Sequence, residues 1–86
     1  PMKIKTLIVD DEPLARDRVK RFLRDEADIQ IVGECGNGAE ALKFIRAEKP
    51  DLVFLDIQMP EKNGFEVVKA LDAKTVPTVI FVTAYD

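Results

Sequence analysis

The sequence contains no histidine, no tryptophan and a single cysteine, Cys35. One cysteine cannot form a disulfide within the chain, and without histidine there is neither a Cys–His zinc site nor a Cys–His catalytic pair. Any step that passes a proton or a phosphoryl group through an imidazole must take that imidazole from a partner. We expect Cys35 to be a small buried apolar residue.

Positive charge is also scarce, because 13 lysines and arginines face 16 aspartates and glutamates, for a net charge of -3. This balance argues against direct contact with nucleic acid or with an anionic membrane surface. No apolar run approaches the roughly 18 residues that a membrane span needs, and the first residues lack the apolar core of a signal peptide. We therefore expect a cytoplasmic chain without membrane contact.

The 86 residues, of which 47% are hydrophobic and 34% charged, predict one globular domain over residues 1–86. Apolar β-rich runs lie at residues 6–9, 29–34, 51–56 and 78–83. Apolar residues at helical spacing lie between these runs, namely Ala15, Val19, Phe22 and Leu23, then Ala41, Leu42 and Ile45, then Phe65, Val68 and Leu71. Pro13 suits the first turn of the first helix, with Asp11 or Glu12 as its cap. The predicted element order is β-α-β-α-β-α-β.

Strands that alternate with helices predict a doubly wound α/β fold with a parallel sheet and helices on both faces. The second run alternates more than the others and suits a sheet edge, whereas the third is apolar throughout and suits the centre. These features favour the strand order 2-1-3-4.

The first helical segment also carries five basic residues, Arg16, Arg18, Lys20, Arg21 and Arg24. The simpler interpretation is a solvated helix face with acidic neighbours. The alternative is a surface on which a partner docks.

Polar residues follow three of the predicted strands. Asp10 and Asp11 end the first strand, Asp56 ends the third, and Thr83 ends the fourth. The carboxyl ends of parallel strands meet at one edge of a sheet, so these side chains should surround one crevice. Ionised carboxylates at such short range repel one another unless a cation is present, and Mg²⁺ prefers this kind of incomplete oxygen cage.

The positions of the aspartates suggest how their roles divide. Asp56 alone ends the central strand, so it has the fewest competing roles and could attack phosphorus to form an acyl phosphate. Asp10 and Asp11 would then hold the metal, and Thr83 would donate a hydroxyl hydrogen bond.

The segments that carry these residues are 7–12 (LIVDDE), 55–60 (LDIQMP) with Gly64 following, and 82–84 (VTA). In order and approximate spacing they resemble the motifs of the response-regulator receiver domains of two-component signalling. The resemblance spans essentially the whole chain and implies the flavodoxin-like receiver fold. Residues 10–16 (DDEPLAR) are also similar to receivers joined to LytTR-type DNA-binding domains, a weaker likeness.

The resemblance implies that Asp56 is phosphorylated by the histidine of a sensor kinase or by a small phosphodonor. It implies direct Mg²⁺ ligation by Asp11, Asp56 and the main-chain carbonyl of Gln58, with Asp10 in a supporting or water-mediated role. Thr83 would bind the phosphoryl oxygens, and Gln58 and Tyr85 would control the access of water during dephosphorylation.

The chain also departs from that family, whose receivers continue through a fourth helix, a fifth strand ending in a lysine, and a fifth helix. No lysine follows Thr83 here. We therefore expect a C-terminally incomplete receiver in which phosphate acceptance is impaired and signal output is absent. We also expect an unpaired fourth strand and an uncovered apolar sheet face through which copies could self-associate.

Two other functions use the same residues. A Mg²⁺-dependent phosphatase would turn over an external substrate, although the sequence lacks the Asp-x-Asp arrangement typical of such enzymes. A binding module with a vestigial site would show no saturable, carboxylate-dependent Mg²⁺ binding.

Overall fold

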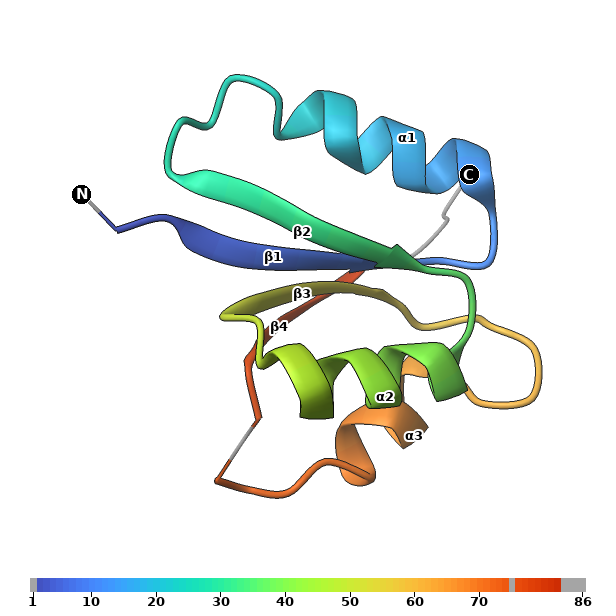
Figure 1. Cartoon of the computed structure of the whole chain (residues 1–86). Helices are drawn as coiled ribbons and strands as arrows, with labels where there is room; N and C mark the ends of the chain where they lie inside the picture. The colour runs from blue at the N-terminus through green and yellow to red at the C-terminus, as the bar shows by residue number, and fades with distance from the viewer. Residues whose placement is uncertain (1, 75, 83–86) are drawn as a thin grey trace.

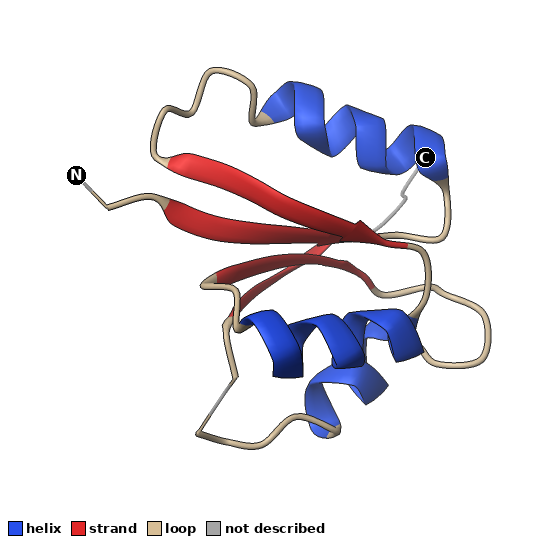
Figure 2. Cartoon of the chain, in the orientation of Figure 1, coloured by secondary structure: helices blue, strands red, loops and turns tan. Residues whose placement is uncertain are grey.

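A computed structural model describes residues 2–74 and 76–82 of the chain. Its elements are β1 (Ile4–Val9), α1 (Pro13–Phe22), β2 (Ile29–Cys35), α2 (Gly38–Glu48), β3 (Leu52–Asp56), α3 (Gly64–Lys69) and β4 (Thr78–Val82). The strands form one parallel sheet in the order β2-β1-β3-β4, which confirms the predicted fold and strand order. Helix α1 covers one face of the sheet and helices α2 and α3 cover the other (Figures 1 and 2).

The main hydrophobic core lies between the sheet and the α2/α3 layer. It consists of Leu7, Val9, Cys35, Ala41, Leu42, Ile45, Val53, Leu55, Met59, Val67 and Leu71. Strand residues alternate between faces, so Leu7 and Val9 of β1 point into this core while Ile8 points toward α1. The predicted inner face of α2 is confirmed, and so is the burial of Cys35, which raises the pKa of its thiol to about 11.

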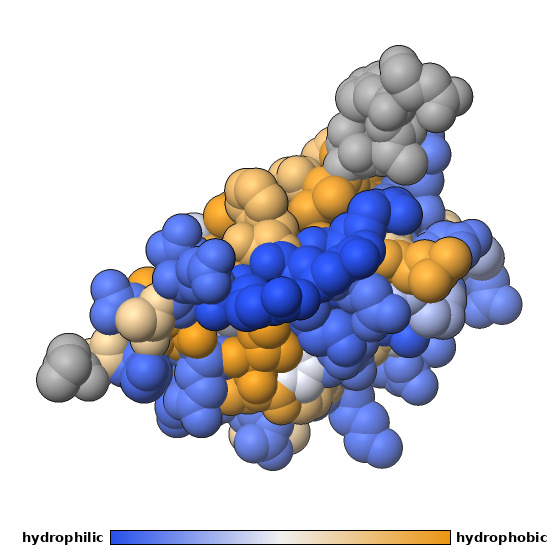
Figure 3. All heavy atoms as spheres, turned by 90° about the horizontal axis from the view of Figure 1, so that it is seen from above, coloured by the Kyte–Doolittle hydropathy of each residue, from blue (hydrophilic) through white to orange (hydrophobic). Residues whose placement is uncertain are grey.

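Helix α1 is less buried against the sheet than the sequence predicts. No residue within α1 is buried, and Phe22 of its predicted inner face is 83% exposed. The helical spacing does place Phe22 on the side of the sheet, where it lines an open cavity together with Phe54 and Ile80. Figure 3, seen from the α1 side, shows a strongly hydrophilic band with apolar surface on both sides of it.

Helix α3 is also shorter than predicted and buries a different residue. It ends at Lys69, so Leu71 contributes to the core from just beyond the helix. Val67 is fully buried, whereas Phe65 is 52% exposed and packs against Phe81 of β4, with ring centroids 4.9 Å apart. A short helix at the margin of the sheet places its first apolar residue beside the edge strand instead of over the core.

The cap of α1 differs in detail from the prediction. Glu12 is the N-cap residue, but its side chain makes no capping hydrogen bond. The carboxylate of Asp10 accepts the main-chain N–H of Glu12 instead, at 2.9 Å. In the part of the chain that the structure describes, no helix is long and apolar enough to cross a membrane.

Candidate functional site

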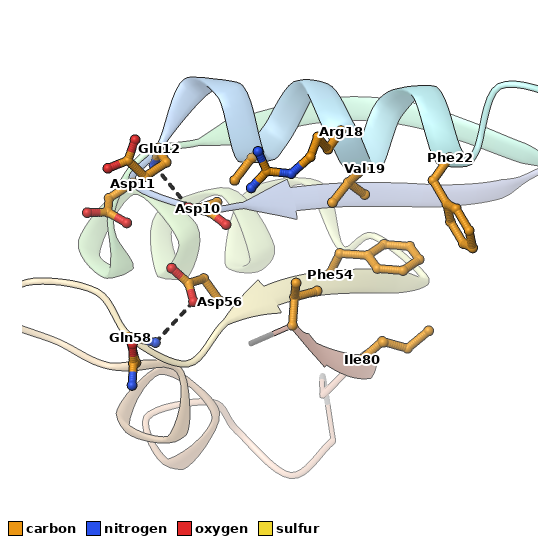
Figure 4. Close-up of a pocket in the computed structure, with 12 residues that line it drawn as sticks. Asp10, Asp11, Glu12, Arg18, Val19, Phe22, Phe54, Asp56, Gln58 and Ile80 are labelled. Carbon is orange, nitrogen blue, oxygen red and sulfur yellow. Dashed lines mark hydrogen bonds between the residues drawn. The ribbon is translucent and has the colours of Figure 1, made fainter. Parts of the chain in front are cut away.

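The register of the two central strands places Asp10 beside Asp56. Val9 of β1 pairs with Leu55 of β3. The next residue of each strand is therefore an aspartate, and alternation turns both side chains away from the main core, toward the α1 face. Figure 4 shows the carboxylates of Asp10 and Asp56 directed toward each other.

Asp11 completes the acidic group from the turn between β1 and α1. One carboxylate oxygen from each of Asp10, Asp11 and Asp56 lies within 4.8 Å of the other two. Asp10 and Asp56 are buried, with 6% and 8% of their surface exposed, whereas Asp11 is exposed. The structure thus confirms the juxtaposition that strand ends predicted, while the chemical roles of these residues stay predictions.

Each of the two buried aspartates accepts a hydrogen bond from the main-chain N–H two residues further along the chain. The carboxylate of Asp10 accepts the N–H of Glu12, and that of Asp56 accepts the N–H of Gln58 at 3.1 Å (Figure 4). Aspartate side chains commonly accept the N–H two residues on, which stabilises the turn that follows. Each strand is therefore followed or ended by a carboxylate with one oxygen held by a main-chain N–H.

Burial and neighbouring charges both act on the pKa of Asp56. Loss of hydration raises its pKa from the ordinary value of 3.8 to about 6, and the negative charges of Asp10 and Asp11 act in the same direction. The hydrogen bond from the N–H of Gln58 opposes this shift only in part. An additional cation would relieve both the desolvation and the repulsion.

The donor set fits a hard divalent ion. Three carboxylates that line a cavity at the ends of the central strands are the oxygen ligands that Mg²⁺ prefers, and the cavity leaves room for water or phosphate oxygens. Of the other predicted site residues, Gln58 lies two residues after the end of β3 and is exposed. Thr83 and Tyr85 lie outside the described residues.

Two features around the acidic group were not predicted as parts of a site. A cavity of about 620 Å³ extends from the three aspartates along α1, and its apolar wall includes Val19, Phe22, Phe54, Ile80 and Val82. Arg16, for which the sequence left a solvated face and a partner-docking surface as alternatives, donates hydrogen bonds to the carbonyl oxygen of Asp10 and to Glu34. Helical periodicity cannot reveal either feature, because both depend on how separate elements meet.

Comparison with known proteins gives concordant results. Residues 6–86 match the family model of the response regulator receiver domain. Over 83 residues the chain is 51% identical to the transcriptional regulatory protein BtsR of Escherichia coli K12 and 54% identical to an uncharacterized response regulatory protein of Shewanella oneidensis. Each match covers 96% of this chain but 35% of the relative, so the chain spans about a third of the length of these relatives.

Solved structures agree with this result. The signal receiver domain of the putative response regulator NarL from Mycobacterium tuberculosis superposes with a TM-score of 0.88 at 38% identity, covering 100% of this chain and 70% of that one. The response regulator domain of Thermotoga maritima CheB gives 0.84 at 36% identity, covering 94% and 60%.

Proposed function

The chain belongs to the response regulator receiver family, a signalling family of two-component systems, and on that premise we propose that Asp56 accepts a phosphoryl group. The observation that carries this proposal is the buried carboxylate of Asp56 at the end of β3, facing Asp10 and Asp11. Such a carboxylate has one oxygen held by the N–H of Gln58 and the other available to react. Position and chemistry both favour Asp56 over the other two aspartates.

The reaction is a transfer between two nucleophiles. An oxygen of the Asp56 carboxylate attacks phosphorus and forms an O–P bond, while the bond from phosphorus to the donor atom breaks and its electron pair stays with the donor. The donor is the phosphohistidine of a sensor kinase, whose P–N bond breaks, or a small acyl phosphate. Because the chain has no histidine, the imidazole must come from the kinase. The same site then hydrolyses its own acyl phosphate.

Mg²⁺ is the proposed cofactor. Asp11, Asp56 and the main-chain carbonyl of Gln58 would bind it directly, with Asp10 in a supporting position. When bound, the ion neutralises charge on the phosphoryl oxygens. The negative charges of Asp10 and Asp11 repel that of Asp56, and this repulsion favours the binding of a cation among the three carboxylates.

Thr83 is proposed to donate its hydroxyl hydrogen bond to the phosphoryl group. Support comes from the pairing of Val82 with Asp56, since Thr83 is the next residue of the chain. Gln58 and Tyr85 are proposed to control the access of water to the acyl phosphate.

Intact mass spectrometry after treatment with acetyl phosphate tests the proposal. The chain should gain the mass of one phosphoryl group in Mg²⁺ but not in EDTA, more slowly than a full-length receiver if acceptance is impaired as expected, and Asp56→Asn should gain none. Asp51→Asn is the matched control, because Asp51 lies at the opposite end of the same strand, where its carboxylate accepts the N–H of Lys5. Modification of Asp56→Asn would refute the assignment. Sustained phosphate release would indicate a phosphatase, and no saturable Mg²⁺ binding would indicate a vestigial site.

The biological setting is proposed from the relatives. BtsR is named a transcriptional regulatory protein, so we place this receiver in a transcriptional regulator whose output domain lies outside these 86 residues. The LytTR-like segment at residues 10–16 suggests the type of output. A sensor histidine kinase is the proposed partner and the cytoplasm the proposed location, since that is where such kinases phosphorylate receivers.

Self-association of this chain is a second proposal. Strand β4 is an edge of the described sheet, and its Ile80 and Phe81 are 44% and 38% exposed. The cavity wall beside it continues to Phe22 on α1. An uncharged edge strand beside exposed apolar side chains favours pairing with a second copy.

A further inference from the structure

Arg16 connects three elements at the acidic end of the sheet. Its Nη1 donates to the carbonyl oxygen of Asp10 at 2.5 Å, and its Nε donates to Oε1 of Glu34 at 3.0 Å. The first contact reaches from α1 to the end of β1, and the second reaches β2. Only 19% of the Arg16 side chain is exposed. A planar guanidinium can make both bonds at once, whereas an ammonium cannot reproduce that fork.

The contact with Asp10 bears directly on Asp11. The N–H of Asp10 donates to the carbonyl of Cys35 at 3.1 Å, and its carboxylate accepts the N–H of Glu12. With Arg16 on the carbonyl oxygen, both main-chain groups and the side chain of Asp10 are occupied. The Asp10 carbonyl belongs to the planar peptide group that joins Asp10 to Asp11. The direction of this carbonyl therefore fixes the positions of the nitrogen and the Cα atom of Asp11.

Asp11 has no comparable support of its own. It is exposed, and its carboxylate accepts no hydrogen bond from the described residues. Its place within 4.8 Å of Asp10 and Asp56 therefore depends on the backbone of the turn. Arg16 is the only side chain of another element, among those described, that donates to this turn.

The charge of Arg16 alone would have the opposite effect on a cation. A guanidinium near the acidic group repels Mg²⁺, although Glu34 partly compensates its charge. Lys20 also pairs with Glu34, at 2.8 Å. Replacement of Arg16 therefore has two opposite effects on the Mg²⁺ affinity. Loss of its positive charge should raise the affinity, whereas loss of its orienting hydrogen bonds should lower it.

We propose that Arg16 is a positioning residue of the acidic site, which orients the Asp10–Asp11 peptide so that Asp11 faces Asp56. The inference rests on the proposed function, since it concerns the Mg²⁺ ligands of that site. Glu34 contributes indirectly, because its carboxylate accepts a hydrogen bond from Nε of Arg16 and so holds the guanidinium in place.

The test compares Mg²⁺ affinities of Arg16→Gln, Arg16→Lys and Arg18→Gln, measured by titrating MgCl₂ at constant ionic strength and following backbone amide shifts by NMR. Arg18 is the matched control, because it lies on the same helix and lines the same cavity without bonding to Asp10. Both Arg16 variants should bind Mg²⁺ about tenfold more weakly, since outer partners of metal ligands have effects of this size. Arg18→Gln should bind as well as the unmodified chain, or more tightly.

The Lys variant separates orientation from charge, because it keeps the positive charge and loses the fork. A weaker Mg²⁺ affinity in a variant whose amide spectrum is still that of a folded chain therefore reflects the lost fork. An Arg16→Lys affinity within twofold of the unmodified chain, or tighter binding by Arg16→Gln, would overturn the inference.

A metal-free measurement distinguishes this inference from the proposed function. Without Mg²⁺, the amide resonances of Asp11 and Glu12 should shift more in Arg16→Lys than in Arg18→Gln, and Glu34→Gln should shift them in the same direction. Absence of Mg²⁺ binding by the unmodified chain would refute the proposed function. Unchanged metal-free resonances in Arg16→Lys would refute the positioning role by themselves.

Discussion

The main-chain carbonyl oxygen of Asp56 lies 2.7 Å from the point where a Cβ at Gly64 would stand. The loop after β3 thus returns so closely over the end of its own strand that only a residue without a side chain fits. The N–H of Gly64 also donates to the carbonyl of Ile57 at 2.9 Å, which holds the loop against the site. The start of α3 at Gly64 is therefore packed directly against the main chain of Asp56.

Gly64→Ala should destabilise the chain by about 1–3 kcal/mol, the usual cost of forcing atoms into a packed region. The added methyl group meets main-chain atoms, which cannot turn aside as a side chain can. Urea denaturation followed by circular dichroism measures the change. Gly36→Ala is the control, since its Cβ would meet only ordinary contacts, the nearest at 3.7 Å. Equal stability of the two variants would contradict the close-approach argument.

Asp56→Asn should stabilise the metal-free chain at neutral pH. Burial raises the pKa of Asp56 from 3.8 to about 6, so the ionised carboxylate destabilises the folded state above that range. The difference between these two pKa values makes the destabilisation on the order of 1–3 kcal/mol.

The sign of the pH dependence follows from that shift. Between pH 6 and 4 the folded chain binds a proton that the unfolded chain does not, so the penalty diminishes as the pH falls and is gone below about 4. The advantage of Asp56→Asn should therefore shrink over this interval. Denaturant titrations of both chains in EDTA at several pH values measure it, and a pH-independent difference would disagree with the burial of an ionisable group.

Mg²⁺ should raise the melting temperature of the unmodified chain, because it binds the folded arrangement of carboxylates. The increase should be smaller in Asp11→Asn and in Asp56→Asn. It should also diminish below about pH 6, where protons compete for Asp56. Calorimetry with MgCl₂, against NaCl of equal ionic strength, checks this. An increase of the same size in all three chains would point to a site elsewhere.

Phe22→Ser should reduce self-association with little loss of stability, since Phe22 is 83% exposed and exposed substitutions usually change stability by about 0.5 kcal/mol or less. Sedimentation velocity over a concentration series measures the association. The neighbouring Leu23, which is 6% exposed, offers the contrast, because Leu23→Ala should cost about 2–5 kcal/mol. A concentration-independent monomer for the unmodified chain would count against the association.

Periodicity predicted the elements of this protein well but their burial less well. The hydrophobic pattern favoured the strand order only weakly, because an apolar run suits the centre of a sheet and an alternating run suits an edge, and the resemblance to receiver domains supported the same order. Phe22 and Phe65 show the limit of that reasoning. Both occupy apolar positions of helices, yet both are more than half exposed, because burial depends on what lies opposite each helix.

The members of the acidic group could be predicted from the amino-acid sequence alone. Asp10, Asp11 and Asp56 end strands, and parallel topology brings strand ends to one edge, so their meeting could be predicted without coordinates. Only the tertiary structure decided that Asp10 and Asp56 are both buried, that burial raises the pKa of Asp56 to about 6, and that Arg16 bonds to Asp10. Strand topology is encoded in local patterns of hydrophobicity, whereas desolvation and contacts between distant side chains exist only once the layers have packed.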